Sequence, residues 1–399
     1  MISFDEALKS TLDHIQPLGS EPSGLESLAG RVAAKEVLAK VYSPSIDASL
    51  KDGYAVHSSD IVHATPDAPV PLRLLGRAAA GEGWEGEVLP GTAVRILSGA
   101  PIPEGATSVV AEEFTRREGD TILIWADSNE GRNILQRGSD VCKGQRLLDA
   151  GEVLQPERIG LLAAAGVDHV EVRKRPHVGV VATGDEVIAP GRTPHDGQLF
   201  ASNLVALAAW CRRFGMRVET QVAKDDAHAI AAALQVALRG NDALLTSGGA
   251  WKGDRDLVVH VLDQLGWTKV YHRVKIGPGK AVGFGMLGRK PVFCLPGGPP
   301  SNQMAFLQLA LPGLLALSGR RVPELPRLPA QLSKEVHGQV DWTQFIYGRL
   351  ERTEDFMIFH PLKMPSRLQM MAHADAILCI PEGVETIPAG AAVCVQTLL

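Results

Sequence analysis

The sequence predicts a multidomain protein of the α/β and β classes, in which a doubly wound α/β domain lies between two mainly β regions. Its 399 residues are too many for one hydrophobic core, so two to four domains are expected. From about residue 53 to 148, short apolar runs are separated by turn signals such as Pro90-Gly91 and Glu118-Gly119-Asp120, which is typical of an all-β module. From 177 to 322, buried strands alternate with helices, which indicates a parallel sheet.

The N-terminal residues carry two helix-start signals. Ser3-Phe4-Asp5-Glu6 is a capping box and predicts a helix to about Ile15. Ser23-Gly24-Leu25-Glu26 repeats the signature, so we expect a second helix over 25–38. The following segment, 42–56, has no helical period and is expected to be a loop that leads into a strand.

The remaining elements follow from hydrophobic period and turn residues. In the first β region we expect a hairpin of 88–89 with 93–97, and a strand at 121–125. A helix is expected at 156–165, and Asp225-Asp226 is expected to cap the helix at 227–238. The expected α/β strands are 177–182, 216–222, 243–245, 270–276, 280–286 and 291–295, with further helices at 202–214, from 257, and from 301. Beyond 324 only strands are expected, at 345–350, 357–360, 376–380 and 392–398.

Composition argues for an ordinary cytoplasmic protein. Charged residues make up 21% of the chain and the net charge is -5, which argues against a nucleic-acid or membrane surface. The N-terminus is polar, so we expect no targeting peptide, and no apolar run approaches the roughly 18 residues of a membrane span. The five cysteines are odd in number and far apart, so buried reduced thiols are expected rather than disulfides or zinc ligands.

Three buried strands of the α/β region end in polar loops that contain glycine or proline. These loops are Thr183-Gly184-Asp185-Glu186, Thr246-Ser247-Gly248-Gly249 and the segment from Pro296 and Gly297 to Ser301. Because the carboxyl ends of parallel strands lie at one edge of a sheet, the loops are expected to line one crevice. Taken singly, each loop is equally well explained as an ordinary solvated connection.

Charged residues near these loops are candidates for an anionic, metal-bearing ligand. Asp185, Glu186, Asp254 and Asp256 could hold a divalent metal or accept hydrogen bonds from a ligand. Lys275 and Lys280 flank Gly277-Pro278-Gly279 and could neutralise a phosphate or oxyanion, although a solvated hairpin end is an equal alternative. The G-x-G-x-x-G match at 283–288 opens no helix, so a dinucleotide site is not expected.

The motifs resemble those of the molybdopterin molybdenumtransferase family, also called MoeA and related to the C-terminal domain of gephyrin. The resemblance covers essentially the whole chain, and its blocks occur in order at fitting spacing. The blocks are Ser49-Leu50-Lys51-Asp52-Gly53-Tyr54-Ala55, 98–106, Gly138-Ser139-Asp140-Val141, Thr183-Gly184-Asp185-Glu186, Ser247-Gly248-Gly249, Gly253-Asp254-Arg255-Asp256, Pro278-Gly279-Lys280 and Leu295-Pro296-Gly297.

The resemblance implies four regions. A helical linker and dimerisation module would comprise 1–42 and 140–173, with a β module, 43–139, inserted into it. A MogA-like α/β domain that binds molybdopterin would comprise 174–322, and a β-barrel-like domain 323–399.

The resemblance also implies a reaction and an assembly. The family takes adenylylated molybdopterin and molybdate, cleaves the adenylate with Mg²⁺, and releases molybdenum cofactor and AMP. It forms homodimers whose active cleft is shared between two chains, and its possible partners are molybdopterin adenylyltransferase and acceptor molybdoenzymes.

Site roles carry over residue by residue. Catalytic roles would fall to Asp52, Asp254, Lys280 and Lys275, and metal ligation to Glu186, Asp254 and Asp140. Substrate binding would fall to Thr183, Gly184, Asp185, Glu186, Ser247, Gly248, Gly249, Asp226 (or Asp225), Pro296, Gly297 and Ser301.

Several positions depart from the family pattern. Trp251 replaces a small hydroxyl residue, Gly277 replaces the first lysine of K-P-G-K, and Gly298 replaces an asparagine. Lys275 or Lys252 could substitute for the missing lysine. Three hypotheses remain open: an insertase, a related protein that binds molybdopterin as carrier or scaffold without efficient turnover, and a different nucleotide-hydrolysing enzyme.

Overall fold

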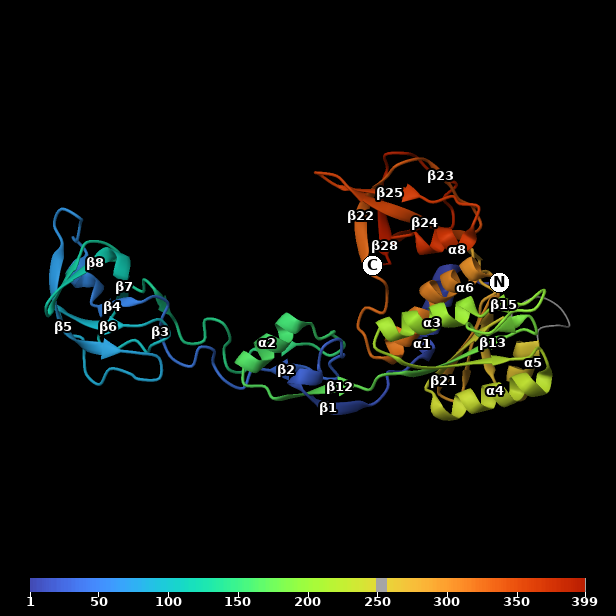
Figure 1. Cartoon of the computed structure of the whole chain (residues 1–399), viewed down its shortest axis with the longest axis horizontal. Coiled ribbons are helices and arrows are strands. Elements are labelled where there is room, and N and C mark those ends of the chain that lie inside the picture. Colours follow the sequence, from blue (N-terminus) through green and yellow to red (C-terminus); the bar gives the residue numbers. More distant parts are fainter. Residues whose placement is uncertain (249–256, 399) are drawn as a thin grey trace.

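The protein is elongated and built from separate bodies. The structure, a computed structural model, describes residues 1–248 and 257–398. Figure 1 shows the β module at one end and the α/β domain with the C-terminal β domain at the other, joined by a narrower connection. We call this connection, residues 20–42 and 140–173, the linker module.

The helices described by the structure are mostly short. They are α1 (Phe4–His14), α2 (Pro156–Ala164), α3 (Ser202–Arg213), α4 (Ala227–Gly240), α5 (Leu257–Gln264), α6 (Pro299–Ala305), α7 (Leu311–Leu317) and α8 (Arg367–Ala372). A π-helical turn, Phe306–Ala310, joins α6 to α7, so the expected long helix from 301 forms and begins two residues earlier. Among the described residues, no helix has the length and apolar character needed to span a membrane.

The β module is a single six-stranded sheet in the order β7-β4-β6-β5-β9-β8. Its strands are β4 (Gly53–Val56), β5 (Val70–Ala78), β6 (Thr92–Ile96), β7 (Ser108–Ala111), β8 (Thr115–Glu118) and β9 (Thr121–Ile124). The predicted hairpin of 88–89 with 93–97 is wrong, because β6 pairs with β4 and β5 instead. Val88 is buried, and its N–H donates to Glu104 O over 2.8 Å. Val88 therefore pairs with the 104 segment rather than with the predicted hairpin partner at 93–97.

The linker module consists mainly of β pairs. β1 (Ser20–Gly24) pairs with β12 (His169–Arg173), and β2 (Val37–Leu38) with β11 (Arg146–Leu148). Nearby, β3 (Ala48–Ser49) pairs with β10 (Ile134–Leu135) where the chain enters the β module.

The helix predicted over 25–38 is wrong. Only a 3₁₀ turn, Leu25–Ser27, forms there, and its N-cap makes no side-chain hydrogen bond. Val32 and Ala33 instead form β-bridges to Val153 and Val172, which are more than 100 residues away. This nonlocal pairing overrides the local signal, so α2 is the one α-helix among the described residues of the linker module.

The first helix forms as predicted but packs outside the linker module. Ser3 and Glu6 complete the capping box, with Ser3 N–H donating to Glu6 Oε2 at 2.9 Å. Thr11 Oγ1 lies 2.8 Å from Tyr271 OH, and Ala7 is buried in the core of the α/β domain. The apolar face of α1 is therefore covered by α7 and the sheet of the α/β domain.

The α/β domain is built on a six-stranded sheet in the order β16-β13-β17-β21-β20-β18. Its strands are β13 (His177–Thr183), β16 (Arg217–Ala223), β17 (Ala243–Ser247), β18 (Thr268–His272), β20 (Gly283–Leu287) and β21 (Lys290–Leu295). Strands β16, β13, β17 and β21 are parallel to one another, as predicted, whereas β20 runs antiparallel to its neighbours β21 and β18. A tight turn at Gly288 joins β20 to β21, and so short a connection requires antiparallel pairing.

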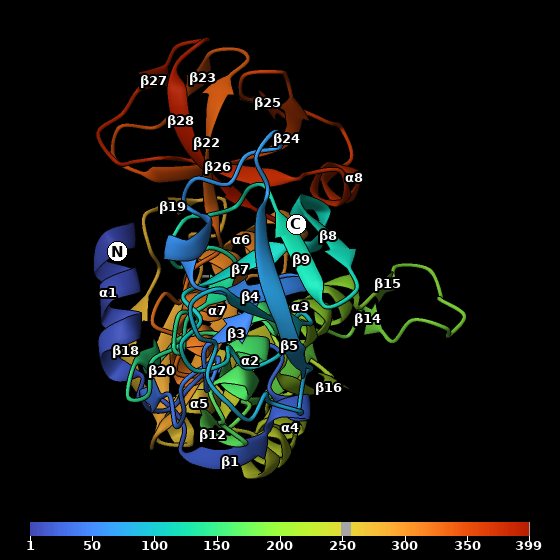
Figure 2. The same ribbon diagram turned by 90° about the vertical axis from the view of Figure 1, so that its left-hand side faces the viewer.

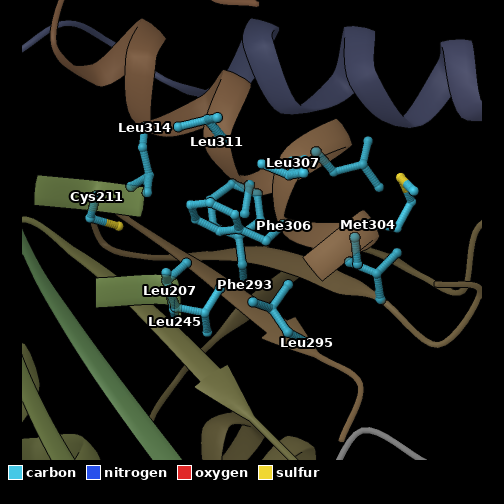
Figure 3. Packing of buried hydrophobic residues seen from close by; sticks show 14 of the residues in the cluster. Leu207, Cys211, Leu245, Phe293, Leu295, Met304, Phe306, Leu307, Leu311 and Leu314 are labelled. Carbon is cyan, nitrogen blue, oxygen red and sulfur yellow. The ribbon is translucent and has the colours of Figure 1, made fainter. Parts of the chain in front are cut away.

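Helices cover both faces of this sheet. One face packs against α1, α3, α6 and α7, and the other against α4 and α5. Figure 3 shows the first face, where Phe293 and Leu295 of β21 meet Phe306 and Leu311 from the helices above. The rigid core therefore lies directly behind the strand ends that carry the polar loops.

The C-terminal domain is a closed five-stranded barrel, as predicted. Its strands are β22 (Arg327–Leu332), β24 (Thr343–Arg352), β25 (Met357–Pro361), β26 (Ala376–Ile380) and β28 (Ala392–Thr397). They pair in the order β24-β25-β22-β28-β26, and β26 returns to β24 to close the barrel. Figure 2 shows the barrel above the α/β domain.

Three smaller features connect or extend these domains. β19 (Ile276–Gly277) of the α/β domain pairs with β24 of the barrel. β23 (Val336–His337) pairs with β27 (Thr386–Ile387). The expectation of strands alone beyond 324 is wrong at α8, whose Ser366 side chain caps the helix.

Candidate active site

The three polar loops lie at one edge of the α/β sheet. β13, β17 and β21 are adjacent and parallel, with Ala182 opposite Ser247 and Ser247 opposite Leu295. The segments that follow these strands therefore leave the sheet side by side, although more than 100 residues separate the first from the third. The structure thus brings together the loops that the sequence predicted to converge.

A pocket of about 450 Å³ opens between these loops. Five of the predicted binding residues line it: Thr183, Glu186, Ser247, Gly248 and Gly297. Lining side chains also come from the segment 199–204 and from α8 of the barrel. The pocket therefore belongs to the α/β domain but has one wall from a second domain.

A hydrogen-bond network holds the floor of the pocket. Ser247 Oγ accepts from Asn302 Nδ2 at 3.0 Å and from Asn203 Nδ2 at 3.3 Å. Asn302 Nδ2 also donates to Pro296 O, and Asn203 Nδ2 to Gly297 O, each over 2.8 Å. Because these two asparagines join two of the polar loops, they set the position of both. Neither residue is predicted as a site residue from the sequence, since each lies in a predicted helix rather than in a loop.

Thr183 offers an unused polar atom to the pocket. Its side chain is buried, and Oγ1 has no hydrogen-bond partner among the described residues. Buried hydroxyl groups are normally paired, so this one is an exception within the described residues, and it belongs to a residue that lines the pocket. Gly248 packs against it with φ of 100°, and a Cβ there would lie 2.7 Å from Thr183 O. A glycine is therefore needed for the two loops to approach.

The acidic residues at this edge have different partners. Glu186 is exposed at the pocket, and its carboxylate lies over Gly184, where a Cβ would meet Oε2 at 2.8 Å. Asp185 Oδ1 accepts from the Asp225 N–H at 3.2 Å, and Asp226 Oδ1 accepts from the Ala229 N–H at 2.9 Å. Asp226 thus caps α4 as predicted, and neither Asp185 nor Asp226 lines the pocket.

An apolar wall completes the pocket. Leu199 and Phe200 belong to β15 (Leu199–Phe200), which pairs with β14 (Val187–Ile188) beside the pocket. Leu368 comes from α8, and all three side chains remain exposed despite their apolar character. This wall is not predicted from the sequence. The apolar pair Leu199-Phe200 next to a helix start was a local signal, whereas nothing local marked Leu368.

A second cavity of about 410 Å³ adjoins the same loop. It is lined by Lys280, Pro296 and Ser301, together with Trp342 and Gln344 of the barrel region. Pro296 lines this cavity and Gly297 lines the first, so the two cavities meet at consecutive residues. Lys280 is exposed there.

Lys275 is directed elsewhere. Its Nζ donates to Glu382 Oε1 at 2.9 Å, and this hydrogen bond raises the pKa of Lys275. Glu382 belongs to the barrel domain, so the ion pair ties two domains together. In this arrangement Lys275 does not line the cavity that contains Lys280.

Two predicted site residues lie in other parts of the chain. Asp52 precedes β4 in the β module, and its Oδ1 accepts from the Ser98 N–H at 2.7 Å. Asp140 is exposed beside Ser43, where the linker meets the β module. Figure 1 shows β4 at the far end of the molecule from β13, so one chain does not bring Asp52 to the pocket. Gly249 and Asp254, with Trp251, Lys252 and Asp256, lie outside the described residues.

Glu186 and Asp140, the two predicted metal ligands within the described residues, lie in different parts of the chain. Among residues 1–248 and 257–398, no three acidic, histidine or cysteine side chains are close enough to form a metal site by themselves. Of the two predicted ligands that the structure describes, Glu186 lines the pocket and Asp140 does not.

Comparisons with known proteins agree over the whole chain. Three family models match: "MoeA N-terminal region (domain I and II)" over residues 2–166, "Probable molybdopterin binding domain" over 179–316, and "MoeA C-terminal region (domain IV)" over 329–398. Molybdopterin molybdenumtransferase 2 of Mycobacterium tuberculosis is 32% identical over 372 residues, which cover 92% of each protein. The chain belongs to the molybdopterin molybdenumtransferase family.

Other members of the molybdopterin molybdenumtransferase family show the same extent of similarity. The Haemophilus influenzae molybdopterin molybdenumtransferase is 30% identical, covering 87% of this chain and 86% of its own. The crystal structure of a molybdopterin biosynthesis MoeA protein from Pyrococcus horikoshii superposes with a TM-score of 0.82 at 30% identity, covering 100% of this chain and 99% of the other. As a family member, the protein is a transferase of molybdenum cofactor biosynthesis.

Proposed function

We propose that the protein inserts molybdenum from molybdate into adenylylated molybdopterin and releases AMP. The observation that carries this proposal is the pocket at the ends of β13, β17 and β21, with its polar floor and apolar wall. Its volume of about 450 Å³ suits a small organic ligand. The adjoining Lys280 cavity provides room for the charged part of the same substrate.

The polar floor and the apolar wall suit a flat heterocycle such as a pterin. Thr183 Oγ1 is free to bond a ring nitrogen or carbonyl group, and Ser247 is held in place by Asn302. Leu199, Phe200 and Leu368 would cover the ring faces and exclude water. Such a site binds through shape and a few placed hydrogen bonds, and so favours one orientation of the substrate.

Lys280 is proposed to bind the phosphate or molybdate oxyanion. Lysine is a compact positive charge that suits these anions. Negative charge builds up on the leaving phosphate oxygen when the adenylate bond breaks, and a cation fixed beside it lowers that barrier. The side chain of Lys280 lies in the second cavity next to the 296–301 loop, so a substrate bound in both cavities would contact it.

Mg²⁺ is proposed as the metal cofactor, with Glu186 as its carboxylate ligand and Asp140 and Asp254 as further candidates. When bound, Mg²⁺ would neutralise phosphate charge and polarise the phosphorus–oxygen bond. Glu186 itself is exposed and free of any ion pair in the described part of the chain, so it can accept a cation.

A homodimer is proposed because one chain leaves the site without Asp52. The elongated shape separates the β module from the pocket by the whole linker module. A second copy in a two-fold arrangement would present its β module to the pocket of the first, and would receive the same in return. Asp52, and Asp140 beside the β module, would then contribute to the site of the partner chain.

A carrier or scaffold without efficient turnover is the second candidate. One observation favours it: the lysine missing at Gly277 is not replaced by Lys275, which is held by Glu382. A carrier would bind molybdopterin in the pocket but would not cleave the adenylate.

The deciding experiment measures AMP release from adenylylated molybdopterin by the purified protein with Mg²⁺ and molybdate. The proposal expects release that requires both ions and falls by at least about tenfold in Lys280→Ala and Glu186→Gln. Glu385→Gln, a change at an exposed barrel residue, is the matched control and should leave the rate unchanged. Tight binding of the substrate without AMP release from the wild-type protein would establish the carrier instead.

A further inference from the structure

A basic cavity lies where the linker module joins the α/β domain. Its volume is about 810 Å³, and it is lined by His177, Arg217 and Asp242 at the starts of β13, β16 and β17. These strand starts form the sheet edge opposite the candidate active site, which lies at the strand ends. The cavity is therefore separate from the site of the proposed reaction.

The charge of this cavity is opposite to that of the chain. Four lining side chains are cationic, Arg31, Lys174, Arg175 and Arg217, whereas two, Glu21 and Asp242, are carboxylates. The excess of two positive charges occurs in a protein whose net charge is -5. Among the described residues, Lys174, Arg175 and Arg217 form no ion pair, and all three are exposed.

Arg31 shows that the cavity has a polar group in need of a partner. Its side chain is 10% exposed, and its Nη2 donates to Glu21 Oε1 at 2.5 Å and to Arg173 O at 2.9 Å. Its Nε is buried and has no acceptor in the described part of the chain. An unpaired buried donor is costly, and the Arg31 residue that carries it lines the cavity.

We propose that this cavity binds a small anion of the diphosphate class and that the bound anion couples the linker module to the α/β domain. Arginine and lysine groups converge on it from three segments, and arginine suits the planar recognition of phosphate oxygens. A diphosphate carries charge to match the local excess, and the concave shape and volume fit a small ligand. Arg31 comes from the linker module and Arg217 from the sheet, so one ligand would contact both.

The test is calorimetric titration of the full-length protein with inorganic pyrophosphate. The wild-type protein should bind saturably, and Arg175→Gln with Arg217→Gln should weaken binding by at least about tenfold. Both residues are exposed, so the double variant should fold normally. Lys334→Gln with Arg352→Gln removes two positive charges from exposed positions on the barrel; this charge-matched control should retain wild-type affinity within about twofold.

A second variant separates this cavity from the candidate active site. Lys280→Ala should keep the saturable pyrophosphate site that the Arg175→Gln, Arg217→Gln double variant loses, and pyrophosphate should slow amide hydrogen exchange in β1 and β12 of this variant. Parallel titrations with phosphate and ADP then show whether a free or a nucleotide-borne diphosphate is preferred. The proposal would be overturned if Lys280→Ala lost pyrophosphate binding while the double variant kept it. It would also be overturned if the wild-type protein showed no saturable binding.

Discussion

Asn302 and Ser247 are joined across the candidate active site by a hydrogen bond of 3.0 Å from Nδ2 to Oγ. Ser247 ends β17, and Asn302 lies in α6 after the third polar loop. Asn302 is 1% exposed and also donates to Pro296 O. One buried amide thus sets the distance between two loops that both line the pocket.

Replacing Asn302 with alanine should loosen these loops. The change leaves Ser247 Oγ without one donor and Pro296 O without its donor, and unpaired buried groups cost about 1–3 kcal/mol. We expect a loss of that size in the free energy of unfolding, measured in urea, and weaker binding of molybdopterin. Asn203→Ala removes bonds from a half-buried side chain and should cost less. Equal stability of Asn302→Ala and the wild type would contradict the role given to this residue.

Gly248 should not tolerate a side chain. Its φ of 100° is strained for alanine, and the added Cβ would lie 2.7 Å from Thr183 O. Gly248→Ala should therefore lose about 1–3 kcal/mol of stability and most of its affinity for molybdopterin. Thermal unfolding and a fluorescence titration would measure the two effects.

Gly298 supplies the matched control for that change. It lies in the third loop at φ of -69°, and a Cβ there would have no neighbour within 4 Å. Gly298→Ala should stay within about 0.5 kcal/mol of the wild type. If Gly248→Ala and Gly298→Ala lost the same stability, the requirement for glycine at 248 would need another cause than the close approach of the first two loops.

Restoring a lysine at position 277 should strengthen oxyanion binding. A Cβ on Gly277 would make only ordinary contacts, at 3.7 Å to Gln344 Cγ, and the position lines the same cavity as Lys280. Gly277→Lys should therefore fold and should lower the molybdate concentration that gives half-maximal AMP release. Gly277→Met has similar length without the charge and should show no gain. A gain in both variants would assign the effect to packing rather than to charge.

Two inactive variants should complement each other if the site is shared between chains. Asp52→Ala and Lys280→Ala change residues in different modules of one chain. A mixed dimer would contain one site with both changes and one intact site, so activity should reappear on subunit exchange. Activity that stays at the level of the separate variants, in a preparation shown to contain mixed dimers, would place both residues in a site made by one chain.

Local patterns were enough to predict much of the fold. The capping box of Ser3 and Glu6, the cap of α4 at Asp226 and the buried strand at 177–182 all appear in the structure. Each depends on residues within one turn or one strand. The predicted helix over 25–38 failed because its backbone pairs with Val153 and Val172, partners that no local window contains.

The sequence by itself determined the alternation of strands and helices and the polar loops at the ends of three strands, because side-chain periodicity and turn chemistry act over a few neighbours. Through its ordered motifs it also indicated the molybdopterin molybdenumtransferase family. Tertiary structure alone decided that Leu368 closes the pocket, that Lys275 pairs with Glu382 over 107 positions, and that Arg31 faces a basic cavity. These relationships depend on how separate domains pack, and packing is set by the combined burial of many distant side chains rather than by any short segment.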